Sequence, residues 1–221
     1  MDIIKQYIKN INLFSHITED ELNTLAKISS TATYNKNSIL YYEADTNNRL
    51  LFLIQGQIKV YKIDKFDNEI FLYYIYDNSM ISELSSLNNG QIHCFSNTEF
   101  VEDSVVLSID FNQFVKEFLL GNELILGFIK ELIQKNQQLQ CIVNRELVFD
   151  ATSKVAFMIN SDLDMFNKLK RTEVSLMLHI QPETLSRVLK RLTRNGIIAI
   201  DKGLIKIENP EELQSIFTGI G

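Results

Sequence analysis

The sequence predicts an α+β fold: an antiparallel β-barrel of the jelly-roll or double-stranded β-helix kind, then a long helix, then a small domain of packed helices and a hairpin. Three patterns support this prediction. Apolar residues with helical spacing open the chain, short apolar stretches separated by turn residues fill about 37–110, and helical spacing returns from Phe111 to about Phe149.

The length of 221 residues exceeds the usual size of one domain, so two modest domains are expected. With 45% hydrophobic and 23% charged residues, the composition is typical of a globular protein. The opening MDIIKQYIKN is amphipathic, and no apolar run approaches the roughly 18 residues that span a bilayer. We therefore expect a cytoplasmic protein with no membrane partner.

The two cysteines, Cys94 and Cys141, lie far apart in the sequence. This number and spacing predict neither a disulfide framework nor a structural zinc cluster. We expect both thiols to be ordinary core residues and no metal site to be present.

Charge is distributed unevenly along the chain. Residues 1–150 carry 12 Lys and Arg against 20 Asp and Glu, a net charge of −8, whereas residues 151–221 carry 10 against 8, a net charge of +2. The total of −6 would argue against a polyanionic partner. The division instead indicates that contact with nucleic acid, if present, involves the C-terminal third.

Short helices are expected first, and Thr18 is placed as an N-cap with Glu21 three residues on as its capping-box partner. The helical spacing is carried by Ile4, Ile8, Ile11, Leu22, Leu25 and Ile28. Strands are then expected in SILYYE, RLLFLIQ, QIKVYKI, EIFLYYIY and VVLSID, which turn-forming pieces such as ADTNN and DKFDN separate. A barrel of this kind commonly encloses a small ligand.

The long helix shows a seam in alternating steps of three and four residues, through Ile125, Phe128, Leu132, Lys135, Leu139, Ile142 and Glu146. Ile129, Ile133 and Val143 widen this apolar face, so one side of the helix can lie on the barrel while another meets a partner helix. The alternative is a helix that packs only on its own domain. We expect a two-fold dimer through Ile125, Phe128, Leu132, Leu139 and Ile142.

These patterns predict three segments. We expect a β-barrel domain with the N-terminal helices in residues 1–120, a dimerisation helix in residues 121–149, and a C-terminal domain of helices and a hairpin in residues 150–221, with a hinge at about 149–152.

The most informative stretch is KRTEVSLMLHIQPETLSRVLKRLTRNGIIAIDKGLIKIEN, from Lys170 to Asn209. It predicts a short helix, a tight turn, and a second helix in which Pro182 occupies the first turn. Asn195-Gly196 then ends the second helix, and IIAI-DKG-LIKI forms a hairpin with Gly203 in its turn. In this order the elements make a winged helix-turn-helix, whose second helix enters the major groove of double-stranded DNA.

Side chains on the polar face of the second helix suit base contacts. Arg187 can donate two hydrogen bonds to guanine, Glu183 can accept from a cytosine amine, and Ser186 can contact a neighbouring base. We expect phosphate contacts from Arg171, Thr184, Lys190, Arg191, Arg194 and Lys202.

The run PETLSRVLKRLTRNGII resembles the recognition helix and wing of the Crp/Fnr superfamily of bacterial transcription regulators. RLLFLIQGQIKVYKIDKFDNEIFLYYI resembles the cyclic nucleotide-binding-like barrel of that family, with Gly56 at its usual glycine, and the helix after Phe111 is similar to the dimerisation helix. The resemblance implies a homodimer that binds palindromic DNA, with RNA polymerase as a further partner. The Glu-x-x-Ser-Arg set is similar to that of the Fnr branch, which implies a TTGAT-N4-ATCAA-like site.

The sequence also departs from the family. Members that bind cyclic AMP carry Gly-Glu-Leu followed by an Arg-Ser pair that holds the phosphate, whereas here Ser82 precedes Glu83 and Leu84, and His93 and Cys94 stand at the pair. A neutral imidazole cannot supply the permanent charge of arginine, so cyclic AMP is not expected to bind. Members with an iron-sulfur cluster need four cysteines, which excludes that cofactor here.

Three effector hypotheses remain for the barrel, whose candidate pocket residues are Glu83, Leu84, His93 and Cys94. Haem with a diatomic gas is the first, with His93, Cys94, Met80 and His16 as candidate ligands. Redox sensing through Cys94 is the second. Control by protein abundance, without a small ligand, is the third.

Two alternatives belong to other classes of protein. A cyclic-nucleotide-dependent regulator or regulatory subunit of Crp type would share the barrel, but it would need the phosphate arginine. An enzyme is not expected, because the sequence shows no Ser-His-Asp order, metal-ligand spacing, Gly-rich phosphate loop or carboxylate pair on one element.

Overall fold

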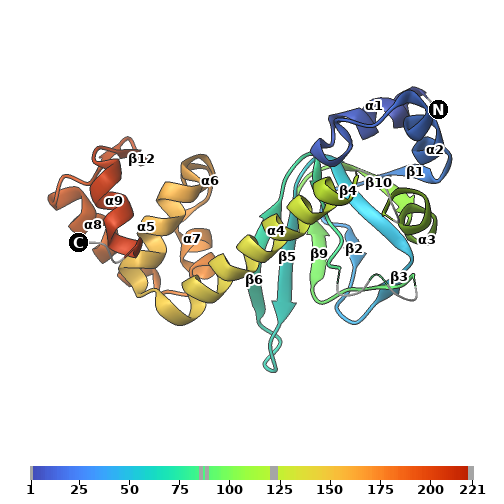
Figure 1. The fold of residues 1–221 in the computed structure, drawn as a ribbon. Helices are drawn as coiled ribbons and strands as arrows, with labels where there is room; N and C mark the ends of the chain where they lie inside the picture. Colours follow the sequence, from blue (N-terminus) through green and yellow to red (C-terminus); the bar gives the residue numbers. More distant parts are fainter. Residues whose placement is uncertain (1, 85–86, 88–89, 120–123, 219–221) are drawn as a thin grey trace. The chain divides into compact units, whose positions relative to one another are not determined.

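The computed structural model describes residues 2–84, 87, 90–119 and 124–218 (Figure 1). The chain divides into two compact units, Met1–Gln138 and Leu139–Gly221, so the boundary lies within the long helix rather than at either end of it. Among the described residues, no helix is long and apolar enough to cross a membrane.

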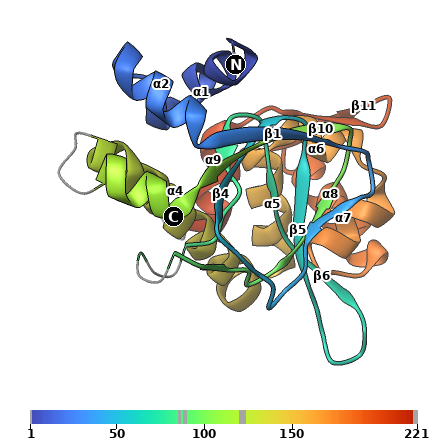
Figure 2. The same cartoon turned by 90° about the vertical axis from the view of Figure 1, so that its right-hand side faces the viewer.

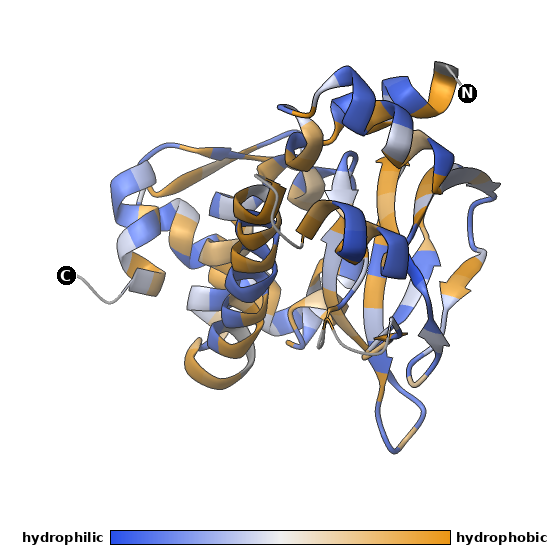
Figure 3. Cartoon of the chain, turned by 45° about the vertical axis from the view of Figure 1, so that its right-hand side comes forward, coloured by the Kyte–Doolittle hydropathy of each residue, from blue (hydrophilic) through white to orange (hydrophobic). Residues whose placement is uncertain are grey.

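Three short helical elements open the N-terminal unit: α1 (Asp2–Asn10), the 3₁₀ helix η1 (Asn12–Phe14) and α2 (Glu19–Lys27). The expected capping box is confirmed at α2. The Thr18 N–H donates to Glu21 Oε2 at 2.8 Å, and the Glu21 N–H donates to Thr18 Oγ1 at 3.3 Å. Figure 3 shows that hydrophobic and hydrophilic segments alternate along the helices, as amphipathic packing requires.

Antiparallel strands build the rest of this unit, in two four-stranded sheets of order β1-β10-β4-β7 and β2-β9-β5-β6 and a small β3-β8 pair. This arrangement fits a jelly roll. The strands are β1 (Ser29–Tyr34), β2 (Ile39–Tyr41), β3 (Thr46–Asn47), β4 (Arg49–Gln55), β5 (Ile58–Ile63), β6 (Glu69–Ile75), β7 (Ser79–Met80), β8 (Ile92–His93), β9 (Asn97–Phe100) and β10 (Ser104–Asp110).

Strand β4 is buried on both faces, which explains its unbroken apolar run. On one face Leu50 and Phe52 join a cluster with the N-terminal helices, with α3 (Phe111–Phe114) and with α4 (Leu124–Val143). On the other face Leu51 and Leu53 join a second cluster with residues of β2, β5, β6 and β9, between the two large sheets. At its end, Gly56 has φ +111°, and an added Cβ would lie 2.1 Å from Ser104 Oγ.

Strand β1 was not predicted, since the sequence indicated strands only from about residue 37. Its sequence, SSTATY, is polar and mostly exposed. It pairs with β10 from Ser29 opposite Ile109 to Tyr34 opposite Ser104, at the edge of its sheet (Figure 2). An exposed edge strand buries few side chains, so it leaves no apolar alternation in the sequence.

The helical region after β10 consists of α3 (Phe111–Phe114), the π-helix η2 (Val115–Leu119), α4 (Leu124–Val143) and the π-helix η3 (Asn144–Val148). Residues 121–123 of the predicted dimerisation helix lie outside the described residues, as does the side chain of Glu146. Two residues of the predicted seam pack on the core of their own unit: Phe128 is 2% exposed, and Leu132 is partly buried.

A different stripe of α4 remains exposed. Ile125, Ile129 and Ile133, each four residues apart, are 45%, 44% and 50% exposed. Leu139 is 56% exposed as well, and Ile142 is half-buried.

In the C-terminal unit, five helices and one hairpin form among residues 151–218, where the sequence indicated three helical stretches and a hairpin. They are α5 (Ala151–Ser161), α6 (Leu163–Lys168), α7 (Arg171–Met177), α8 (Pro182–Arg194), β11 (Ile198–Asp201), β12 (Leu204–Ile207) and α9 (Pro210–Thr218). One hydrophobic cluster, centred on Val155, Phe166, Leu189 and Leu213, holds them together.

Candidate DNA-binding surface and effector domain

Helix α8 has the predicted bounds and polarity. Pro182 lies in its first turn, where a backbone N–H is not needed, and Glu183 lies at the positive end of the helix dipole. The stripe that faces the core is Leu185, Val188, Leu189 and Leu192, all buried. The polar face is therefore presented to solvent, with Glu183, Ser186 and Arg187 exposed.

The turn between α7 and α8 is tight. His179 adopts φ +50°, and the Ile180 N–H donates to the Ser175 carbonyl at 3.0 Å. Ser175 is 2% exposed, and its hydroxyl donates to the Thr172 carbonyl at 2.8 Å. A small residue whose hydroxyl is satisfied within its own helix lets α7 and α8 pack closely, as a helix-turn-helix requires.

Arg187 is held in place on the exposed face. Its Nη2 donates to Thr184 Oγ1 at 3.2 Å, which orders the side chain and leaves the other guanidinium donors available. Thr184 thus supports Arg187, in addition to its predicted role at a phosphate.

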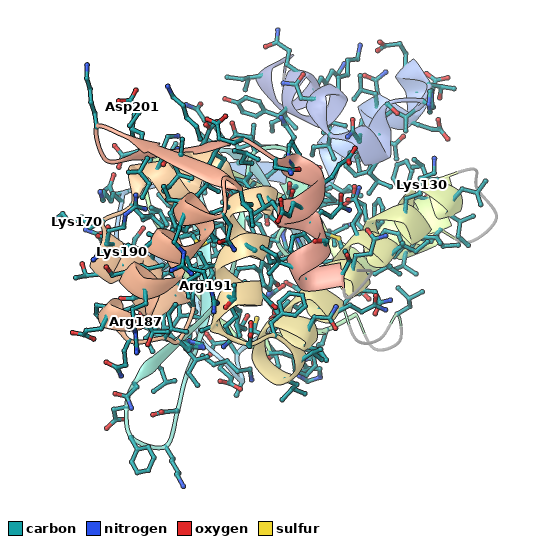
Figure 4. The ribbon with its side chains drawn as sticks, turned by 90° about the vertical axis from the view of Figure 1, so that its left-hand side faces the viewer. Lys130, Lys170, Arg187, Lys190, Arg191 and Asp201 are labelled. Atoms are coloured by element: carbon teal, nitrogen blue, oxygen red, sulfur yellow. The ribbon has the colours of Figure 1, made fainter. Side chains whose placement is uncertain are left out.

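The remaining predicted phosphate contacts fall into two groups. Lys190, Arg194 and Lys202 are exposed, and Figure 4 shows Lys190 on the same side of the unit as Arg187 and Lys170. Arg171 and Arg191 also hydrogen-bond within the protein, although Arg191 is exposed. Arg191 donates to Thr152 Oγ1 at the start of α5. Hydrogen bonds from Ser153 are the main cause of the lowered pKa of the Asp150 N-cap; the positive charge of Arg191 makes a smaller contribution, and burial opposes the shift.

Arg171 helps to hold the wing, which is the β11–β12 hairpin, against the helices. Its Nη2 donates to the Gly203 carbonyl at 2.8 Å, and its guanidinium lies over the Phe166 ring at 5.0 Å. Its Nη1 is buried and finds no hydrogen-bond partner among the described residues. Arg171 is partly buried and its guanidinium contacts the wing, so its predicted phosphate contact stays a prediction.

The wing has a second attachment, which sequence reasoning missed. Asn167 of α6 accepts from the Ile205 N–H at 2.7 Å and donates to the Ile205 carbonyl at 3.0 Å. The turn residues Lys202 and Gly203 have φ +50° and +86°, as a type I′ hairpin requires. A lone asparagine in a short helix carries no sequence pattern that would indicate this role.

In the N-terminal unit, Glu83 is the centre of a polar cluster inside the sheets. Its carboxylate accepts from the Phe95 N–H at 2.9 Å, from Ser96 Oγ at 2.8 Å and from the Tyr73 hydroxyl. Burial and the neighbouring negative charge of Glu83 raise the pKa of Tyr73, so the phenol stays protonated. Three donors already satisfy this carboxylate.

The four predicted pocket residues do not gather in one place. Cys94 is buried near Glu83, and the Asn47 amide donates to its sulfur at 3.7 Å. Leu84 packs against the other hydrophobic cluster, and the His93 side chain is exposed on β8. Burial, followed by the negative charge of Glu83, raises the pKa of the Cys94 thiol to about 11, which disfavours a reactive thiolate at neutral pH.

These residues fit neither haem nor a cyclic nucleotide. Met80 and Cys94 are buried in two different hydrophobic clusters, whereas His16 and His93 are exposed, so the candidate haem ligands do not converge. For a cyclic nucleotide, His93 faces solvent instead of a phosphate, and the Glu83 carboxylate is occupied by the protein's own donors.

Comparison with known proteins supports both units. A model of the cyclic nucleotide-binding domain matches residues 31–119, and a model of the Crp-like helix-turn-helix domain matches residues 160–216. The chain is 19% identical to the cyclic AMP receptor protein of Thermus thermophilus over 221 residues, which cover 96% of this chain and 100% of the relative.

Many solved structures share the fold, among them the following two. FixK2 from Bradyrhizobium japonicum has a TM-score of 0.64 and 16% identity, with 86% of this chain and 97% of that chain covered. A CooA mutant from Carboxydothermus hydrogenoformans has a TM-score of 0.66 and 20% identity, with 86% and 88% covered.

The helix-turn-helix with its wing and the separate β-rich unit together define a DNA-binding transcription regulator with an effector-binding domain. The chain belongs to the Crp/Fnr superfamily.

Proposed function

We propose that the protein binds a TTGAT-N4-ATCAA-like palindrome as a homodimer and regulates transcription there. The observation that carries this proposal is the exposed set of Glu183, Ser186 and Arg187 on one face of α8, with Arg187 ordered by Thr184. Arg187 reads guanine, Glu183 accepts from cytosine, and Lys190, Arg194 and Lys202 contact phosphates around them. The two recognition helices of the dimer then lie about 34 Å apart in successive major grooves.

Dimerisation uses the stripe of Ile125, Ile129 and Ile133 on α4. These three isoleucines are about half exposed on one helix face, so they leave apolar surface in contact with water. A second copy of the same helix covers this surface in a self-complementary, two-fold contact. The function is one of binding rather than catalysis. We further propose a cytoplasmic location and RNA polymerase as the partner that reads the bound dimer.

Selection from random double-stranded DNA tests the proposal. The wild-type chain should enrich inverted repeats with a G·C pair in each half-site, and Arg187→Ala should lose that preference at a cost of about 1 to 3 kcal/mol in binding. Arg194→Ala is the matched control, because loss of a phosphate contact weakens all sites alike. Enrichment of half-sites that lack the G·C pair, or an unchanged preference in Arg187→Ala, would show that α8 does not read DNA in this way.

A further inference from the structure

A small pocket lies within the N-terminal unit, between the β6–β7 region and α4. Its volume is about 60 Å³, enough for a few heavy atoms. The sheet side contributes Tyr74, Ile75, Tyr76, Ser79 and Met80, and the helix side contributes Glu131, Gln134, Lys135 and Gln138. The Glu83 carboxylate and its three donors are not among these lining residues.

Lys135 supplies a positive charge that the protein pairs only in part. Its Nζ is 3.5 Å from the Ile81 carbonyl and 5.6 Å from the Tyr73 ring centroid. Burial lowers the pKa of the ammonium to about 8, although the negative charges of Glu83 and Glu131 partly oppose this. An additional negative group in the pocket would therefore stabilise the charged ammonium of Lys135.

Groups that suit a positively charged donor lie one turn before and one turn after Lys135. Glu131 is half-buried, and burial raises the pKa of its carboxyl, so the charged form gains from a positive group. Gln138 Oε1 is buried and accepts no hydrogen bond from any described residue. Because a buried acceptor without a donor costs about 1–3 kcal/mol, this atom indicates a missing donor at the pocket.

We propose that the pocket binds a small amino carboxylate, a molecule with one ammonium and one carboxylate group joined by one or two carbons. Its carboxylate accepts from Lys135, and its ammonium donates to Gln138 Oε1 and faces Glu131. Ile75 and Met80 provide the apolar wall for a short side chain. The ligand bridges the sheet and α4, the helix that carries the proposed dimer contact, so the proposed function makes it the effector.

Calorimetry on the full-length protein with glycine and alanine as probes tests the site. Both should bind, whereas acetate and methylamine, each lacking one charged group, should bind at least tenfold more weakly. Lys135→Gln and Gln138→Leu should each weaken alanine binding at least tenfold, and Lys130→Gln, an exposed lysine on the same helix, is the matched control that should not. Binding should also decline above about pH 8, as Lys135 loses its proton.

Several outcomes would overturn the proposal: no heat with either amino acid, acetate bound as tightly as alanine, or unchanged affinity in folded Lys135→Gln. Circular dichroism establishes that the variants fold, and Glu131→Gln gives a second measurement, since it should weaken alanine binding and leave acetate binding unchanged.

DNA affinity measured with and without alanine separates this inference from the proposed function. A protein that selects the palindrome but ignores alanine contradicts only the amino carboxylate site. A protein that binds alanine with no change in DNA affinity contradicts its role as effector. Failure of the wild-type chain to select any palindrome would contradict the proposed function and leave the binding result intact.

Discussion

Arg171 shows how one side chain can lie in a DNA-binding motif and act on the protein. Its hydrogen bond to the Gly203 carbonyl and its position over Phe166 connect the start of α7 to the wing turn. Lys202, the neighbour of Gly203, is exposed and is proposed to contact phosphate. We therefore propose that Arg171 affects DNA binding by holding Lys202 in position.

Arg171→Ala should reduce DNA affinity, and it should lower the salt dependence by no more than Lys202→Ala does. A phosphate contact contributes about 0.9 to the slope of log K against log salt concentration, whereas a positioning contact contributes none of its own. In a Lys202→Ala background the effect of Arg171→Ala should largely disappear. Arg194→Ala is the comparison, and it should lower the slope by about 1. A slope that falls further in the Arg171→Ala/Lys202→Ala double variant than in Lys202→Ala alone would return Arg171 to the phosphate contacts.

The two cysteines should differ sharply in reactivity. Cys94 is buried with its pKa raised to about 11, whereas Cys141 is exposed on α4. Because the thiolate is the reactive form, a thiol reagent at neutral pH should modify Cys141 first and Cys94 only on unfolding. Mass analysis of the labelled peptides measures both in one sample. Oxidant-dependent DNA binding that Cys94→Ala abolishes would restore the redox hypothesis.

At the scale of elements, the sequence predicted a helix or strand best where one face of that element is buried and the other is exposed. Helix α8 combines a buried leucine-rich stripe with a proline start and a glycine after its end, so three independent patterns agree on its bounds. Strand β1 has no such contrast and was missed. On α4, periodicity identified an apolar helix but could not distinguish the face of Phe128, which packs in the core, from that of Ile129.

The proposed dimer contact can be tested on the exposed stripe of α4. Ile129→Asp combined with Ile133→Asp should yield monomers that no longer bind DNA tightly, because burial of two unpaired carboxylates at an apolar contact is costly. Both residues are about half exposed within the chain, so the fold itself should tolerate the change. Sedimentation measures the mass, and Lys130→Asp on another face of the helix is the control. An unchanged dimer would place the interface elsewhere.

At the scale of the whole molecule, the order of elements was predictable because each domain leaves its own periodicity and charge. The pocket proposed to bind an effector was less predictable. It depends on contacts between segments far apart in sequence, such as Lys135 with the Ile81 carbonyl. No sequence pattern marks Lys135 or Gln138 as a binding residue. In the sequence, Lys135 only interrupts an apolar seam.

The last prediction concerns cyclic AMP, which should neither bind appreciably nor alter DNA affinity. The chain carries a domain of the cyclic nucleotide-binding type, but its polar cluster is closed on itself: Glu83 accepts from Phe95, Ser96 and Tyr73. His93 faces solvent, so a cyclic phosphate would meet neither a permanent cation nor a free donor pair at that position.

Entry of the nucleotide would also break the Tyr73 bond to Glu83 and leave buried polar groups unpaired, at about 1–3 kcal/mol each. Calorimetry with cyclic AMP, run beside a DNA titration at the same salt concentration, measures both quantities. Micromolar binding with a matching gain in DNA affinity would show that the cluster opens, and that the chain is a cyclic-nucleotide-dependent regulator after all.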